Sequence, residues 1–288
     1  MHTLWHIVSH ALLDSAMLLP FLFLTYLFME LLEHKAGDRL KGAIARAGRL
    51  GPLFGGLLGL VPQCGFSALA AGLFAGRIVS PGTLLAVFLA TSDEMLPIFL
   101  GAGIGGTRVL VVLGIKLGVA VLVGFLVDLL LVKKRGEIEV GELCDEENCH
   151  CGERGVWLSA LLHTVKIFAF VLAVNLALTA VFELVGEAAI ASVMSDIPVV
   201  GVLAASLIGL IPNCAASVLV ATLWIKGVIS GGAMLGGLLT GAGAGLLVLF
   251  RTNRHLRENL LLLGILFGVG AAFGILFDLT GLAALLGL

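Results

Sequence analysis

The sequence predicts an all-α, polytopic integral membrane protein built from two inverted-topology repeats, with helices that proline breaks or makes re-entrant. Three observations support this fold class. First, 59% of the 288 residues are hydrophobic and 12% are charged, with a mean hydropathy of +1.13, whereas about 25% of residues are charged in soluble domains. Second, apolar stretches long enough for membrane helices, and too long for barrel strands, recur along the whole chain. Third, the second half repeats the pattern of the first.

One hydrophilic stretch divides the apolar segments into two sets. We expect a first membrane repeat at 1–132, a cytoplasmic loop rich in Cys, His and acidic residues at 133–155, and a second, inverted membrane repeat at 156–288. The expected apolar segments are 11–33, 51–76, 81–103 and 109–132 in the first repeat, and 156–182, 198–225, 231–250 and 260–287 in the second.

A shift of 150 residues aligns the rare residues of the two halves. The chain has only 7 Pro and 5 Cys, so their coincidence indicates a duplication rather than a shared apolar composition. The paired aspartates lie near the ends of their segments, where we expect them to stabilise helix ends rather than to bind substrate. The coinciding residues are Pro62 with Pro212, Cys64 with Cys214, and Asp128 with Asp278.

The positive-inside rule gives the relative orientation of the repeats. The loop 34–50 carries five basic residues and its repeat partner, 184–200, carries none. Likewise, 251–258 carries three arginines where 101–108 has one. The repeats are therefore predicted to be inverted, in a multi-pass protein of the inner (plasma) membrane with its N-terminus outside. The basic triplet that begins at Lys133 places the central loop in the cytoplasm.

Inversion requires an odd number of crossings in each repeat, yet each repeat shows an even number of apolar segments. One segment must therefore return on its own side or split into two. The segment 51–76 is interrupted around Pro62, and 81–103 is interrupted around Asp93 and Pro97. The sequence leaves both candidates open.

The paired proline motifs give the main prediction of a substrate site. Proline removes a backbone donor and leaves a carbonyl free, and irregular backbone at membrane depth persists where it lines a cavity or is buried in protein. Inverted repeats bring such breaks to the midplane, where transporters bind substrate. The alternative is a pair of ordinary proline kinks with packed cysteines. The predicted substrate pathway contains Pro62, Gln63, Cys64, Ser92, Asp93, Glu94, Pro212, Asn213 and Cys214.

Two adjacent acids interrupt the third apolar segment. A carboxylate at the bilayer centre costs at least ~2.5 kcal/mol, so Asp93 and Glu94 need a proton, a metal cation, or a basic partner such as Lys116 or Lys166. Their repeat partners are glycine and alanine, so this feature belongs to one repeat. The alternative is that the acids lie near an aqueous end of the segment and help to define topology.

The central loop carries three thiols and an imidazole close together, beside three acidic residues. Such groups bind soft or borderline metal ions, so we expect a loop that captures metal transiently. The alternative is a disordered acidic linker. With the membrane residues, the predicted metal ligands are Cys64, Cys214, Asp93, Glu94, Cys144, Cys149, His150 and Cys151.

These motifs together resemble a family, the ten-span heavy-metal exporters, whose members are labelled manganese transporters or arsenic efflux permeases. The resemblance covers essentially the whole chain. It implies export of a metal or metalloid, with Cys64 and Cys214 on the paired motif. The segments that carry it are 18–26 with Met29 and Glu30, 61–65, 91–94, the Cys/His loop and 211–214.

The leading functional prediction is a secondary exporter of a divalent, manganese-like metal or of a metalloid, coupled to protons, with the metal as substrate and no tightly bound cofactor. We expect no enzyme activity. Nucleic acid is excluded as a partner because 17 basic residues are balanced by 19 acidic ones. Two alternatives stay open: an intramembrane enzyme acting on lipid phosphate, and a flippase or transporter of an organic or lipid anion, which would depend on Lys116 and Lys166.

Overall fold

The computed structural model describes residues 19–20, 22–24, 27, 50–63, 65–92, 94–131, 156–185 and 198–282. Within these ranges all regular structure is helical, and five stretches are long and apolar enough to cross a membrane. The expected all-helical membrane fold is confirmed. The five stretches are Pro81–Gly101, Gly106–Leu131, Ala160–Ala180, Gly231–Thr252 and Leu256–Leu279.

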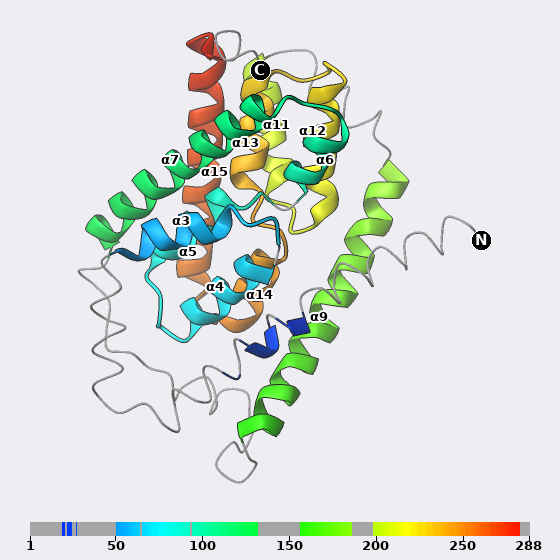
Figure 1. Cartoon of the computed structure of the whole chain (residues 1–288). Coiled ribbons are helices and arrows are strands. Elements are labelled where there is room, and N and C mark those ends of the chain that lie inside the picture. Colours follow the sequence, from blue (N-terminus) through cyan, green and yellow to red (C-terminus); the bar gives the residue numbers. More distant parts are fainter. Residues whose placement is uncertain are drawn as a thin grey trace.

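Five helices of the first half correspond to five of the second under the 150-residue shift, and the counterpart of α9 lies mostly outside the described residues (Figure 1). Helices α5 and α13 have matching bounds, and α7 and α15 begin at matching residues. The helices are α3 (Gly51–Gly59), α4 (Gly65–Ala75), α5 (Pro81–Ala90), α6 (Met95–Gly101) and α7 (Gly106–Leu131), then α9 (Val156–Val185), α11 (Pro198–Gly209), α12 (Cys214–Ile225), α13 (Gly231–Thr240), α14 (Ala244–Thr252) and α15 (Leu256–Leu279).

The start of α5 is held by a carboxylate from the end of α7. Asp128 accepts hydrogen bonds from the Ser80 hydroxyl at 2.6 Å and from the Gly82 amide at 2.8 Å. The Ser80 hydroxyl also accepts from the Thr83 amide at 3.0 Å, so both side chains satisfy amides that the first turn leaves without helical partners. The predicted helix-end role of this aspartate is confirmed.

The second repeat contains the same arrangement at the start of α13. Asp278 accepts from the Ser230 hydroxyl at 2.6 Å and from the Gly232 amide at 2.8 Å. The Ser230 hydroxyl accepts from the Ala233 amide at 3.0 Å. The repeat therefore extends from the sequence to individual hydrogen bonds.

Helices α3 and α4 form a hairpin that returns to its starting level. Helix α3 lies so close to α5 that a Cβ on Gly51 would strike Thr83, whereas one on Gly59 would strike Val87 and Ala90. Helices α3 and α5 therefore run parallel. Since α4 connects them, α4 must carry the chain back to the level at which α5 begins. At 9 and 11 residues, α3 and α4 span only about 14 and 17 Å, about half of a ~30 Å hydrocarbon core. Of the two candidates, 51–76 is the segment that turns back.

The other candidate segment is also interrupted, but it continues in one direction. Helix α5 ends at Ala90, and α6 begins at Met95 after a break. Helix α7 runs antiparallel to α5, because Asp128 contacts the start of α5 and Lys116 contacts Thr91 just beyond its end. The part of α7 that precedes Lys116 therefore extends past the end of α5, alongside α6, which contacts α7. The pair α5–α6 is a broken span.

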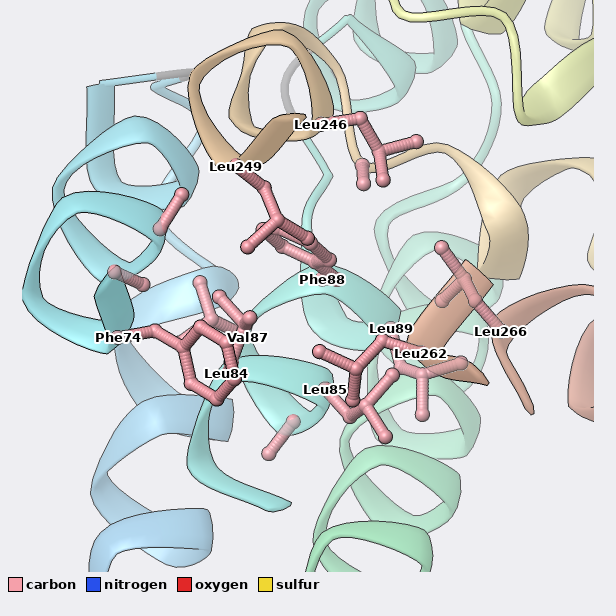
Figure 2. Packing of buried hydrophobic residues seen from close by; sticks show 14 of the residues in the cluster. Phe74, Leu84, Leu85, Val87, Phe88, Leu89, Leu246, Leu249, Leu262 and Leu266 are labelled. Atoms are coloured by element: carbon pink, nitrogen blue, oxygen red, sulfur yellow. The ribbon is translucent and has the colours of Figure 1, made fainter. Parts of the chain in front are cut away.

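The two halves exchange helices and share one core. Helix α14 of the second half packs on α4 of the first, and reciprocally α6 packs on α12. Each half therefore lays a short helix against a hairpin helix of the other half. Figure 2 shows the shared core, in which side chains of α4 and α5 pack against those of α14 and α15. The labelled residues are Phe74, Leu84, Leu85, Val87, Phe88, Leu89, Leu246, Leu249, Leu262 and Leu266.

The matching long helices α7 and α15 run in opposite directions. Arg77, which precedes α5, pairs with Glu258 at the start of α15. The end of α7 lies at the same level, because Asp128 contacts Ser80. Helix α7 therefore ends, and α15 begins, at what we call the Arg77 end of the molecule (Figure 1). Helix α15 reaches the opposite end, where Asp278 contacts the start of α13.

Some expected segment bounds differ from the helices. Helix α15 begins at Leu256 and ends at Leu279, rather than covering 260–287. It ends there because Gly281 adopts a φ of 64°, a left-handed conformation that glycine tolerates and that terminates helices. Helix α7 begins at Gly106, three residues before the expected segment.

Candidate functional site

The two proline motifs form matching tight turns between short helices. The Gln63 amide donates to the Val61 carbonyl at 2.7 Å, across Pro62. The same bond, at 2.7 Å, joins the Asn213 amide to the Ile211 carbonyl across Pro212. Proline suits the centre of such a three-residue turn because its φ is fixed and it needs no donor. The predicted breaks are thus present in both repeats.

The side chain of Asn213 is used within the protein. It is 4% exposed. Its Oδ1 accepts from the Ala215 amide at 2.7 Å and caps α12, while its Nδ2 donates to the Thr179 hydroxyl of α9 at 3.1 Å. Both ends of this amide thus have partners within the protein, and its predicted contact with substrate stays a prediction. Asparagine immediately before a helix is a strong N-cap signal, and that signal could have predicted the role.

The thiol of Cys214 lies at the first position of α12 and is partly exposed. Its repeat partner, Cys64, lies outside the described residues. Gln63, beside it, is partly exposed, and Pro62 is exposed at the tip of its hairpin. The first motif therefore presents more of its surface than the second, in which Pro212 is only partly exposed.

The hairpin tips and the breaks of the long spans lie at one depth in the molecule. The end of α3, at Gly59, contacts Ala90 at the end of α5. The end of α11, at Gly209, contacts Thr240 at the end of α13. Each proline turn thus begins where the neighbouring half-helix ends.

The hydroxyls at the α5 break are buried and bonded to the helix. Thr91 and Ser92 are 6% and 2% exposed. The Thr91 hydroxyl donates to the Val87 carbonyl and the Ser92 hydroxyl to the Ala90 carbonyl, both at 2.8 Å. The Ser92 bond satisfies a carbonyl in the last turn of α5, whereas the Val87 carbonyl also accepts from the Thr91 amide at 2.9 Å.

A buried lysine joins the two broken spans. Lys116 of α7 is fully buried. Its Nζ donates to the Thr91 carbonyl, just past the end of α5, and to the Leu238 carbonyl in the last turn of α13, at 2.7 Å. The ends of two half-helices from different repeats therefore meet at one ammonium group. Lys166, the other lysine considered above, lies on an exposed face of α9.

The acidic pair is only half described. Glu94 is partly exposed and immediately precedes α6, whereas Asp93 lies outside the described residues. At the matching place before α14, Gly243 has a φ of 54°, and Gly245 contacts Ser67 of α4. Close packing of α14 on α4 therefore lies directly beside the second break.

Among the residues with described positions, no group of three or more His, Cys, Asp or Glu side chains could hold a metal ion. The central loop lies outside the described ranges, so its metal ligands remain predictions. These are Cys144, Cys149, His150 and Cys151, together with the membrane residues Cys64 and Asp93.

The broken spans and paired helical hairpins define a multi-pass helical membrane protein with discontinuous helices, an arrangement that also occurs in secondary transporters. Residues 3–184 match the family ArsP_2, described as "Putative, 10TM heavy-metal exporter". The chain belongs to this family, which confirms the family resemblance noted in the sequence. The match covers 3–184 rather than essentially the whole chain, so it does not include the second proline motif. No curated protein and no solved structure matches the chain.

Proposed function

We propose that the protein is a secondary active transporter that exports a heavy-metal or divalent cation, or a metalloid, in exchange for protons. Membership of the heavy-metal exporter family supports export of a metal. The structural observation that carries the proposal is the meeting of the broken spans α5–α6 and α13–α14 at Lys116. Discontinuous helices that meet at depth are typical of the substrate and coupling sites of secondary transporters.

The two repeats would lie in the membrane with opposite topologies. The opposed directions of α7 and α15 support this, as does the distribution of charge. The ion pair of Arg77 with Glu258 marks one end of the molecule. Three further basic residues lie near this end in the sequence, Arg251, Arg254 and Arg257. The opposite end carries Arg108 and Lys226. By the positive-inside rule the Arg77 end is cytoplasmic.

The crossing count fits this topology. In each repeat the hairpin contributes no net crossing, while the broken span and the long helix contribute one each. Helix α9 supplies a third crossing in the second repeat, and the first apolar segment would supply it in the first repeat. Three crossings per repeat is an odd number, as inversion requires.

Substrate would pass at the depth of the breaks. We expect the pathway to contain Pro62, Gln63 and Cys64 with Ser92, Asp93 and Glu94 of the first repeat, and Pro212 and Cys214 of the second. Carboxylates suit a manganese-like ion and thiolates suit softer metals. Asn213 would act as a support, because its amide holds α9 and α12 in place.

The charge of the exported solute decides whether its export must be coupled to proton movement. Moving one charge against 100 mV costs ~2.3 kcal/mol, so exporting a dication costs about twice that. Proton exchange at Asp93 and Glu94 would supply this energy. Neutral arsenite has no such cost, and thiols alone would bind it. The cytoplasmic Cys/His loop would act outside the membrane as an accessory that captures metal.

The competing anion transporter receives less support. It would need a lysine that faces the substrate, yet two backbone carbonyls already accept hydrogen bonds from the Lys116 ammonium. We therefore assign Lys116 to the framework rather than to substrate binding.

The test is counterflow in proteoliposomes that contain the purified full-length protein. Vesicles loaded with unlabelled Mn²⁺, Zn²⁺, Cd²⁺ or arsenite are diluted into the same labelled solute. We expect saturable accumulation for one of these classes, sensitive to an imposed pH gradient if the solute is a dication. Matched vesicles containing the Asp93→Asn, Glu94→Gln protein are the control. Counterflow of none of the four solutes by a folded, reconstituted protein would contradict the proposal.

A further inference from the structure

We call the place where the ends of α5 and α13 meet the crossing of the broken spans. Negative potential is concentrated there. The last carbonyls of a helix have no helical donors, and the carboxyl end of a helix carries about half a negative charge. At this crossing the ends of α5 and α13 approach a common point, because one side-chain atom bonds to both Thr91 and Leu238. A buried position of this kind favours a cation.

The cation is supplied by one repeat only. The residue that matches Lys116 in the second repeat is Leu266, which is 1% exposed and packs in the shared apolar core near Leu89 (Figure 2). A second cation is not needed there, because the single ammonium already reaches carbonyls from both repeats, 122 positions apart in the chain for Leu238. The two repeats therefore share this one ammonium group instead of each having its own.

We infer that the Lys116 ammonium replaces a bound monovalent metal cation at the crossing, so that removing this side chain creates a Na⁺ site. Backbone carbonyls at unwound segments and at half-helix carboxyl ends are the groups that bind Na⁺ in transporters with broken helices. An ammonium tethered to α7 meets the same need without an ion from solution. The wild-type protein therefore requires no co-bound Na⁺ at this point, whichever solute it exports.

Thermal unfolding of the full-length protein in detergent tests this directly. Wild-type protein and the Lys116→Ala variant are heated in sodium, potassium or choline chloride at equal ionic strength. We expect the wild-type midpoint to be the same in all three salts. The variant should unfold at a lower temperature in choline and regain about 3 °C or more as Na⁺ rises to saturation, as ligand linkage predicts.

Two control variants separate a specific site from a general salt effect. Lys116→Met keeps an unbranched chain of similar length but no charge, so it should lose stability and gain nothing from Na⁺ because the side chain fills the space. Lys166→Ala removes a lysine from an exposed face of α9 and should show no difference between salts. Equilibrium dialysis with labelled Na⁺ should find about one saturable ion per chain in Lys116→Ala alone.

Several outcomes would overturn the inference. These are equal midpoints of Lys116→Ala in sodium and choline, a Na⁺-dependent rise in the wild type, or rescue of Lys116→Met to the same extent. If Lys116→Ala cannot be purified in choline, Lys116→Ser supplies an additional oxygen ligand, and recovery of either variant only in Na⁺ supports the site. Failure of both to fold in either salt counts against it.

Transport gives an independent readout that rests on the proposed function. Metal counterflow by Lys116→Ala should depend on Na⁺, whereas wild-type counterflow should not. If the wild type moves none of the solutes, the proposed function fails, and the unfolding and dialysis results still decide the cation site. If the wild type transports and the folded variant transports without Na⁺, the inference about Lys116 fails alone.

Discussion

Arg77 and Glu258 form a two-point ion pair that joins the two repeats. Nη1 of Arg77 lies 2.9 and 2.8 Å from the two carboxylate oxygens of Glu258. Nη2 lies 3.1 Å from Nδ1 of His255, and Asn253 donates to the same carboxylate at 3.1 Å. Arg77 also has a φ of 58°, as its repeat partner Gly227 has a φ of 71°. The arginine therefore occupies a turn position that favours glycine, and the ion pair explains its presence.

The first prediction concerns this link. Glu258→Gln should lower the free energy of unfolding by about 1 kcal/mol, because the two side chains are 18% and 26% exposed and solvent screens part of the pair. The unfolding midpoint in detergent should fall by about 2–4 °C. Arg108→Gln is the matched control, since Arg108 is exposed at the repeat-equivalent position, and it should have little effect. Equal losses for both variants would show that the pair adds no stability.

The second prediction compares the two aspartate caps. Asp128→Ala and Asp278→Ala should each lower the free energy of unfolding by about 1–2 kcal/mol, because each removes the carboxylate that accepts from a first-turn amide and from the neighbouring serine hydroxyl. The matching distances from the two carboxylates in the two repeats predict similar losses. The double variant should lose the sum, because distant sites behave additively. A large loss from one variant and none from the other would mean that the repeats do not share this stabilisation.

The third prediction concerns the paired thiols. Cys64→Ser and Cys214→Ser should each reduce transport of a soft metal or of arsenite by about 10-fold or more, because each removes one soft ligand. Both variants should enter the membrane and elute as the wild type does. Counterflow at several substrate concentrations measures the loss. Normal export by the double variant would make the thiols packing residues and move the substrate site elsewhere.

The fourth prediction concerns the carboxylates at the first break. Asp93→Asn with Glu94→Gln should abolish proton-coupled export, because a neutral amide cannot alternate between a proton and a metal ion. The wild type should release protons when it binds a dication. Calorimetry in two buffers of different ionisation enthalpy counts them. Zero release in the wild type, with intact transport in the variant, would exclude antiport and favour thiol-based transport of a neutral metalloid.

The sequence predicted the repeat because proline, cysteine and aspartate are rare or costly in apolar segments, so their coincidence carries information. It did not decide between the two candidate segments. Both are interrupted, and the difference between a hairpin and a broken span lies in which distant helix each end contacts. The contact of Gly59 with Ala90 is such a difference.

Single polar residues were harder to assign from sequence. An amide beside a proline break can bind a ligand or cap a helix, and Asn213 does the latter. Lys116 was considered as a partner for the acids, and that pairing stays a prediction because Asp93 lies outside the described residues. The structure adds an acceptor that was not predicted, the Leu238 carbonyl in the other repeat. A backbone acceptor leaves no mark in the side-chain sequence, so this contact required the fold.

The exchanged packing of α4 with α14 and of α6 with α12 has a consequence for biogenesis. The ribosome completes the first repeat before the helices that cover α4 and α6 have been made. Until α12 and α14 enter the bilayer, these short helices lack the partners that bury their contacting faces, and neither is long enough to be held by the lipid alone. The packing of the first repeat therefore cannot be completed until residue 252 has entered the bilayer. A chain arrested after the central loop would present these faces to chaperones and membrane proteases.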